Sequence, residues 1–293
     1  MNQRLAELLQ LLDLERLEDN LYRGQSHDIG SPQVFGGQVL GQALVAASRT
    51  VEERLVHSLH AYFLRRGDVN APIVFEVDRS RDGGSFTSRR VVAIQHGQPI
   101  LTMSASFHLT ESGIDHQAPM PEAPPPEGLR DLGDINAEIL DQVPERVRFY
   151  FRHQRPFEFR PVNPPNYTDP VKSAPVKQVW FRALDHLPDD QPLHRCLLAY
   201  VSDYHILETA TQPHGFSFLH LQMASIDHAI WFHRDVRADD WLLYVIDSPS
   251  ASGARGFGRG AIYSRDGILV ASVAQEGLIR RHSNWTSPAG KQK

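Results

Sequence analysis

The sequence predicts an α+β protein of two similar halves, each a helix wrapped by an antiparallel sheet. The first reason is the order of the patterns, since an apolar helix pattern followed by several strand patterns occurs twice. The second is an internal correspondence: residues 62–65, YFLR, match residues 231–234, WFHR, and Arg90 matches Arg259 at the same offset of 169 residues. The two sheets are expected to join edge to edge, because an unpaired edge strand promotes aggregation.

Length and composition indicate a folded, soluble protein. The chain has 293 residues, of which 41% are hydrophobic and 22% charged, which is enough for two domains. A net charge of −5 gives no reason to expect a nucleic-acid partner. The single cysteine, Cys196, excludes an intrachain disulfide and a cysteine-rich zinc site, and it fits a reducing compartment. Its position on the apolar stripe of a predicted helix makes it a core residue.

Metals, other cofactors and membrane insertion are not expected. The 15 histidines show neither HxxxH nor HExxH spacing, so no metal site is predicted. No segment approaches the roughly 18 uninterrupted apolar residues of a membrane helix. Charges interrupt the apolar residues near the N-terminus, unlike a signal peptide, and the final residues, GKQK, are not a peroxisomal signal. The predicted location is therefore cytoplasmic.

Residues 1–111 are expected to form the N-terminal repeat. An amphipathic helix at the start is followed by a short strand at residues 20–26. Gly36-Gly37 then comes directly before an apolar helix pattern. Four predicted strands complete the repeat, at residues 57–66, 73–80, 85–95 and 99–109.

A connector and a second repeat make up the rest of the chain. Residues 112–146 are rich in proline and predict a stiff connector, with one helical patch at residues 135–140. Residues 147–286 are expected to form the C-terminal repeat, and residues 287–293 a tail. Its predicted elements are a strand, a helix and four strands, at residues 177–187, 193–209, 222–234, 241–247, 253–263 and 268–279.

Asp203 is the unusual residue of the predicted helix at 193–209. At the helical spacing it lies on the border of the apolar stripe, next to Cys196 and Ala199, whereas His194, Arg195, Ser202 and His205 mark the opposite face. A carboxylate that is partly buried without a partner has a raised pKa and costs stability. Such a residue has either a hydrogen-bonded partner or a functional role. The structural alternative is an aspartate at a half-hydrated helix edge.

Several long motifs together resemble one known family. VFGGQVLGQAL, HSLHAYFLRRGD, ASIDHAIWFHR, SASGARGFGRG and LVASVAQEG are similar to the bacterial acyl-CoA thioesterase II family, in the right order and from about residue 5 to residue 281. The resemblance implies a double hotdog fold and hydrolysis of acyl-CoA, with medium- to long-chain substrates, to a free fatty acid and CoA. It also implies a homo-oligomer, either a dimer or a tetramer, and no cofactor.

The resemblance also implies the catalytic residues. In this family an Asp, a Thr and a Gln together orient the hydrolytic water, and Asp203 and Gln275 match the Asp and the Gln. Ser225 stands where the family usually has Thr, and it offers the same hydroxyl group. Asp227 is the alternative carboxylate, because it shares a strand face with Ser225, whereas His228 next to it should point to the opposite face.

Two alternatives to an active thioesterase remain open at this point. One is an acyl-CoA binding or sensing protein that has lost turnover, and the other is a hydratase. A hydratase needs an Asp and a His that act together, and the sequence offers no convincing pair. The presence of polar residues at all three family positions argues against a protein that only binds.

The two halves differ in a way that predicts one active site per chain. Gly36-Gly37 at the start of the first helix has no counterpart before the second, and Asp203 has none on the first. The amide of Gly37 or Gln38 is therefore expected to polarise the thioester carbonyl, with glycine at 37 letting the acyl group approach. The alternative is that the glycines only permit tight packing.

The phosphates of CoA need cations or free amides. The arginines predicted to bind them are Arg65, Arg66, Arg90, Arg255 and Arg259.

Overall fold

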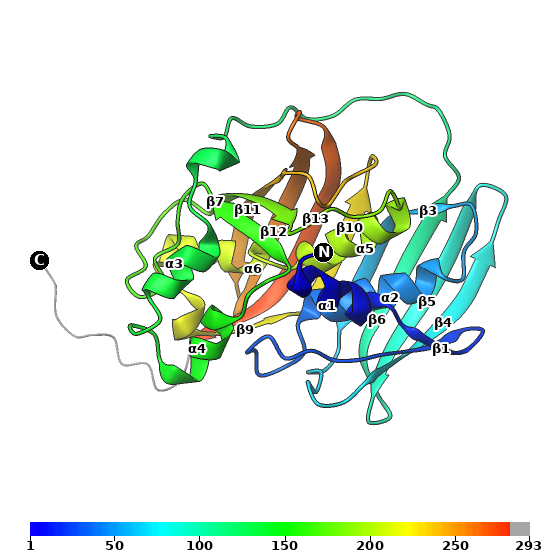
Figure 1. Ribbon diagram of the computed structural model, residues 1–293, viewed down its shortest axis with the longest axis horizontal. Coiled ribbons are helices and arrows are strands. Elements are labelled where there is room, and N and C mark those ends of the chain that lie inside the picture. Colours follow the sequence, from blue (N-terminus) through cyan, green and yellow to red (C-terminus); the bar gives the residue numbers. More distant parts are fainter. Residues whose placement is uncertain (282–293) are drawn as a thin grey trace, which may run out of the picture.

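A single antiparallel sheet connects both halves of the protein. The computed structural model describes residues 1–281, so the predicted tail at 287–293 lies outside the described residues. Within residues 1–281 the sheet has 13 strands in the order β1-β2-β4-β5-β6-β3-β10-β13-β12-β11-β8-β7, with β9 also paired to β13 (Figure 1). The first six strands in this order come from the first half of the chain. The strands from β10 to β7 come from the second half. The prediction of two repeats within one α+β fold is confirmed.

The first half contains the predicted elements and one extra strand, β1. Its elements are α1 (Gln3–Leu12), β1 (Glu15–Glu18), β2 (Leu21–Gly24), α2 (Gly36–Ser48), β3 (Leu55–Phe63), β4 (Ile73–Asp82), β5 (Phe86–Gln95) and β6 (Gln98–His108). Strand β5 illustrates why they form, since its side chains alternate between the core and the solvent face.

The second half repeats this order after a connector with short helices. The connector and the start of the repeat contain η1 (Pro126–Gly128), α3 (Leu132–Glu138), α4 (Glu145–Arg152), β7 (Phe157–Pro161), β8 (Val176–Ala183), α5 (Gln191–Val201) and α6 (Ile206–Thr209). The chain continues through η2 (Gln212–His214), η3 (Phe218–His220), β9 (Leu221–Ser225), β10 (Asp227–Phe232), β11 (Leu242–Ser252), β12 (Arg255–Ser264) and β13 (Leu269–Arg281). Helix α3 confirms the predicted helical patch, whereas α4 and β7 were not predicted.

Strands β3 and β10 join the two halves edge to edge, as predicted. They pair in antiparallel register, with Tyr62 opposite Asp227 and Ser58 opposite Trp231. His60 lies opposite Ala229, and these two residues are separated by the same 169 positions that relate the repeats. The local twofold relation between the halves therefore passes through this pair.

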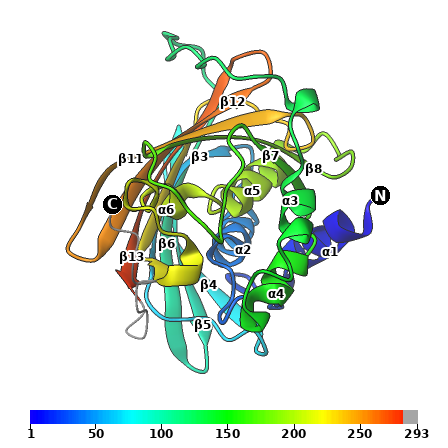
Figure 2. The ribbon, with the colours of Figure 1, turned by 90° about the vertical axis from the view of Figure 1, so that its left-hand side faces the viewer.

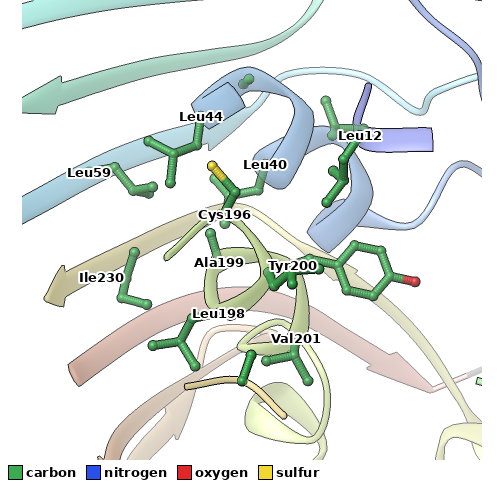
Figure 3. Packing of buried hydrophobic residues seen from close by; sticks show 14 of the residues in the cluster. Leu12, Leu40, Leu44, Leu59, Cys196, Leu198, Ala199, Tyr200, Val201 and Ile230 are labelled. Carbon is green, nitrogen blue, oxygen red and sulfur yellow. The ribbon is translucent and has the colours of Figure 1, made fainter. Parts of the chain in front are cut away.

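Helices α2 and α5 lie side by side in the hollow of the curved sheet, and α1, α3 and α4 lie on their other side (Figure 2). Leu40 and Leu44 of α2 point toward Cys196 of α5 (Figure 3). Cys196 is buried, and burial raises the pKa of its thiol to about 12, so it is a core residue as predicted.

Helix α5 differs from the prediction in two ways. It is buried all round, so His194 and Arg195, predicted on a solvent face, lie in the interior. Arg195 donates to the carbonyl oxygen of Val56 and pairs with Asp235. The helix also ends at Val201 rather than at 209, because His205 has a left-handed backbone with φ of +69°. Asp203 therefore lies in a turn between α5 and α6.

The strand predicted at residues 222–234 is interrupted at Ile226. There the Ile226 amide donates to the carbonyl of Glu276, and its own carbonyl accepts from the amide of Phe63. The interruption lets β9 and β10 pair with different parts of the sheet. Within residues 1–281 no helix is both long and apolar enough to cross a membrane.

Candidate active site

The carboxylate of Asp203 is the centre of a buried polar cluster. Its side chain is 6% exposed. Oδ2 accepts a hydrogen bond of 2.8 Å from the backbone amide of Gly37. Oδ1 accepts from Nε2 of Gln275 at 3.0 Å and from the hydroxyl of Ser225 at 3.4 Å. Nε2 of Gln275 also donates to the Ser225 hydroxyl. The three side chains predicted to act together are thus in direct contact.

These groups come from four separate elements. Asp203 follows the end of α5, Ser225 ends β9, and Gln275 is a buried residue in the middle of β13. The fourth group, the Gly37 amide, lies at the start of α2 in the other half. A carboxylate is stabilised there because the first amides of a helix have no partner within the helix and carry partial positive charge.

The amides of Gly37 and Gln38 were expected to be free to polarise the thioester carbonyl, but both already have acceptors. The Gly37 amide is bonded to Asp203, and the Gln38 amide donates to the carbonyl of Phe35 at 3.1 Å. A side chain on Gly37 would begin 2.2 Å from the carbonyl oxygen of Tyr200. Glycine at this position thus lets α2 approach α5, and it does not make room for an acyl group.

Gly36 makes room for the carboxylate of Asp203. A Cβ atom on this residue would lie 2.7 Å from Oδ2 of Asp203. Its amide has no hydrogen-bond acceptor within residues 1–281. Gly36 also lines an open cleft of about 210 Å³, together with Ser225. The cleft therefore reaches the polar cluster at this glycine.

His228 joins the cluster although the sequence did not suggest it. Its Nδ1 lies 3.3 Å from Oε1 of Gln275, and its Nε2 lies 2.9 Å from the hydroxyl of Ser202. Asp227 has a different environment, since its Oδ1 accepts from the amide of Glu276 at 2.7 Å. The prediction that Asp227 shares the face of Ser225 and that His228 points away is wrong: the interruption at Ile226 breaks the alternation, so His228 and not Asp227 lies with the cluster that contains Ser225. The contact partners of His228 lie on other elements, so no local sequence signal reveals them.

Two of the five predicted arginines line the cleft, Arg65 and Arg66. Arg65 donates to the carbonyl of Pro99 at 2.8 Å, and Arg66 has no hydrogen bond or ion pair with any residue in 1–281. The other three do not line it. Arg255 is paired with Glu276 and Arg259 with Asp247, and Arg90 is exposed on β5.

A larger cavity of about 810 Å³ adjoins the cleft. The two share Gln33 and Arg66 in their linings. Strand β9 connects them, because Ser225 lines the cleft and Leu221 and Met223 line the cavity. Most of the remaining lining is apolar and comes from the loop before α2, from α4 and from η3, including Val147, Phe149, Tyr150, Phe218 and Leu219.

Comparison with known proteins identifies the family. Residues 147–278 match the family model described as acyl-CoA thioesterase, and residues 23–108 match that of the acyl-CoA thioesterase N-terminal domain. The chain is 42% identical to acyl-CoA thioesterase 2 of Haemophilus influenzae, over 96% of this chain and 99% of that protein. It is 41% identical to human acyl-coenzyme A thioesterase 8, over 92% and 88% respectively. This chain belongs to the acyl-CoA thioesterase II family.

Solved structures agree with this membership in the acyl-CoA thioesterase II family. An acyl-CoA thioesterase II from Mycobacterium marinum has a TM-score of 0.78 and 45% sequence identity, covering 96% of this chain and 100% of that one. The fold is the double hotdog, and the chain is a thioester hydrolase acting on acyl-CoA. Hydrolysis requires a water molecule that attacks the thioester carbon. The space beside Gly36 matters for this reaction because it joins the cleft to the carboxylate of Asp203.

Gly36→Ala is expected to lower kcat roughly ten- to a hundred-fold, because its Cβ would lie 2.7 Å from Oδ2 of Asp203 and would displace the carboxylate. The matched control is Gly41→Ala in the same helix, where the nearest atoms to a new Cβ lie at 3.4 Å, an ordinary contact. Thiol release from acyl-CoA and thermal unfolding should be measured for both. Equal kcat values in the two variants would show that turnover does not depend on the space between Gly36 and the Asp203 carboxylate.

Proposed function

We propose that the chain hydrolyses medium- to long-chain acyl-CoA with a water held by Asp203, Ser225 and Gln275. The observation that carries the proposal is the hydrogen-bonded cluster of these side chains, which meets the cleft at Ser225 and beside Gly36. Asp203 accepts the proton of the attacking water, and the Ser225 hydroxyl and the Gln275 amide hold the carboxylate in place through its Oδ1 atom. The products are a free fatty acid and CoA.

The hydrogen bonds of Asp203 leave room for this water. An ionised carboxylate offers about four acceptor positions, and three are used by Gly37, Gln275 and Ser225. The fourth is on Oδ2, beside Gly36, which lines the cleft. A water in this position reaches the substrate without displacing any donor that stabilises the carboxylate.

The amide of Gly36 is the best donor for the oxyanion. It is the first amide of α2, it has no acceptor within residues 1–281, and its residue lines the cleft. The positive end of the helix dipole favours the negative charge that develops on the carbonyl oxygen. This role moves the predicted polarising amide by one residue, since Gly37 and Gln38 already have acceptors.

The proposed substrate class follows from the cavity next to the cleft. Leu221, Met223 and Ser225 lie on one face of β9 because side chains alternate along a strand. Four residues at about 3.3 Å each give a path of roughly 13 Å from the hydroxyl to Leu221. An acyl chain that starts at the cluster and follows this apolar path is of medium to long length. Its burial contributes about 0.8 kcal/mol per methylene group.

The CoA part of the substrate requires a charged contact near the mouth. Arg65 and Arg66 are exposed and line the cleft, and Arg66 has no partner within residues 1–281. We assign them to the CoA phosphates ahead of Arg90, Arg255 and Arg259. An ion pair already compensates Arg255 and Arg259, and a phosphate gains less by replacing such a partner.

Asp203→Asn should lower kcat by two or more orders of magnitude, since general-base catalysis is worth roughly 10²- to 10⁴-fold. Asp227→Asn is the matched control, because the only hydrogen bond of this carboxylate within residues 1–281 is the one from the amide of Glu276. Steady-state thiol release separates the two. Loss of turnover in Asp227→Asn with normal turnover in Asp203→Asn would exchange their roles, and no hydrolysis by the unaltered chain would indicate a binding protein.

Met223→Trp should reduce kcat/KM for palmitoyl-CoA at least about ten-fold more than for butyryl-CoA, because it fills the path along β9 without charge. The control is Met120→Trp, because Met120 packs against the separate apolar cluster around Trp180. It should leave the ratio of the two kcat/KM values, for palmitoyl-CoA and butyryl-CoA, unaltered. An equal loss for both chain lengths would show that the cavity does not hold the acyl chain.

A homo-oligomer is also proposed, and the seam between the halves supports it. Tyr62 is 58% exposed and Trp231 is 37% exposed, on strands β3 and β10. Exposed aromatic side chains on a sheet mark interaction surfaces. Light scattering should give the mass of a dimer or tetramer, and Tyr62→Ser with Trp231→Ser should lower it. A monomeric mass for the unaltered chain would refute the assembly.

A further inference from the structure

His228 is a buried histidine on β10 with two hydrogen-bond partners and no contact with the cleft. It is 1% exposed, and burial lowers the pKa of its imidazole, so the ring is neutral near pH 7 and carries one proton. Its Nδ1 faces Oε1 of Gln275 at 3.3 Å, and its Nε2 faces Oγ of Ser202 at 2.9 Å. The nearest atom of Asp203 is 4.0 Å away.

The direction of each hydrogen bond follows from the acceptors. The Asp203 carboxylate only accepts, so the amide nitrogen of Gln275 must face it and Oε1 must face His228. Because Oε1 also only accepts, His228 carries its proton on Nδ1. Nε2 is then an acceptor for the Ser202 hydroxyl, which is also within donating distance of the carbonyl of Ala199, at 3.0 Å.

The fold does not require polar residues at these positions. The repeat offset of 169 residues relates His228 to Leu59, and the offset of 170 that relates Gly97 to Gly267 relates Gln275 to Ala105. Leu59 and Ala105 are paired in register in the first half, and both are buried. The half without the catalytic aspartate thus fills the same place with apolar side chains.

We propose that His228 is a positioning residue that holds the amide of Gln275 with its nitrogen toward Asp203 and Ser225. This inference rests on the proposed role of Gln275. Without the Nδ1 proton, Oε1 of Gln275 is buried without a donor, and rotation of the amide would place an oxygen against the carboxylate. His228 then acts on the attacking water only through Gln275, and it touches neither substrate nor water.

The direct test is His228→Leu, which introduces the residue found at the matching position of the first half. It should lower kcat about ten- to a hundred-fold, the usual cost of removing an orienting partner, with KM within about two-fold. His228→Asn should restore most of the kcat, because its amide nitrogen replaces the Nδ1 donor. A kcat of His228→Asn as low as that of His228→Leu would contradict the proposed hydrogen bond.

A double-mutant cycle separates positioning from general destabilisation. In a Gln275→Ala background, His228→Leu should cause no further loss of kcat, since the group on which it acts is absent. An equal loss in both backgrounds would overturn the proposal. Gln275→Ala with normal kcat would instead refute the role of Gln275 in the proposed function, so the two failures are distinguishable.

Two further variants keep the test decisive. His194→Leu is the control, because His194 is also buried but bonds to the carbonyl of Pro188 and the amide of Ala238. It should lower the melting temperature with kcat per folded enzyme unchanged. If His228→Leu does not fold, Ser202→Ala replaces it in the cycle. This variant removes one oxygen and should lower kcat about three- to ten-fold, but only when Gln275 is present.

Discussion

The structure of the site depends on stabilising one buried carboxylate with donors from both halves of the chain. A buried charge without partners would be neutralised or would destabilise the fold. Asp203 avoids this through the amide of Gly37 from the first half and the amide group of Gln275 from the second. The Gly37 contact is possible only because α2 and α5 approach closely. The hydrogen bond that stabilises Asp203 therefore forms only when the two helices pack together.

The two repeats contribute different groups to the polar cluster around Asp203. The first half supplies the helix N-terminus, and its glycines make room for Asp203 and for the carbonyl of Tyr200. The second half supplies the carboxylate, the hydroxyl and the amide side chain. At the positions that match His228 and Gln275 the first half has Leu59 and Ala105, whose side chains form no hydrogen bonds. Both halves keep the same arrangement of a helix against an antiparallel sheet, and they differ in the side chains at these positions.

Much of the fold and part of the site could be predicted from the sequence. Strand alternation and the 169-residue correspondence predicted both sheets and their shared edge, because these signals are local or repeated. The end of α5 was missed, since nothing in the sequence marks the left-handed backbone at His205. The Gly37 contact and the hydrogen bonds of His228 were missed because they depend on the distance between elements far apart in the chain. The resemblance to a family supplied Ser225 and Gln275, which spacing alone would not have connected to Asp203.

The most direct test of the account is a crystal structure with a ketone analogue of acyl-CoA, in which a methylene group replaces the thioester sulfur and prevents hydrolysis. The account predicts one analogue per chain, with its carbonyl oxygen at the amide of Gly36. An ordered water should lie within about 3.2 Å of Oδ2 of Asp203 and face the carbonyl carbon. A carbonyl placed at Asp227, or a second occupied site in the same chain, would contradict it.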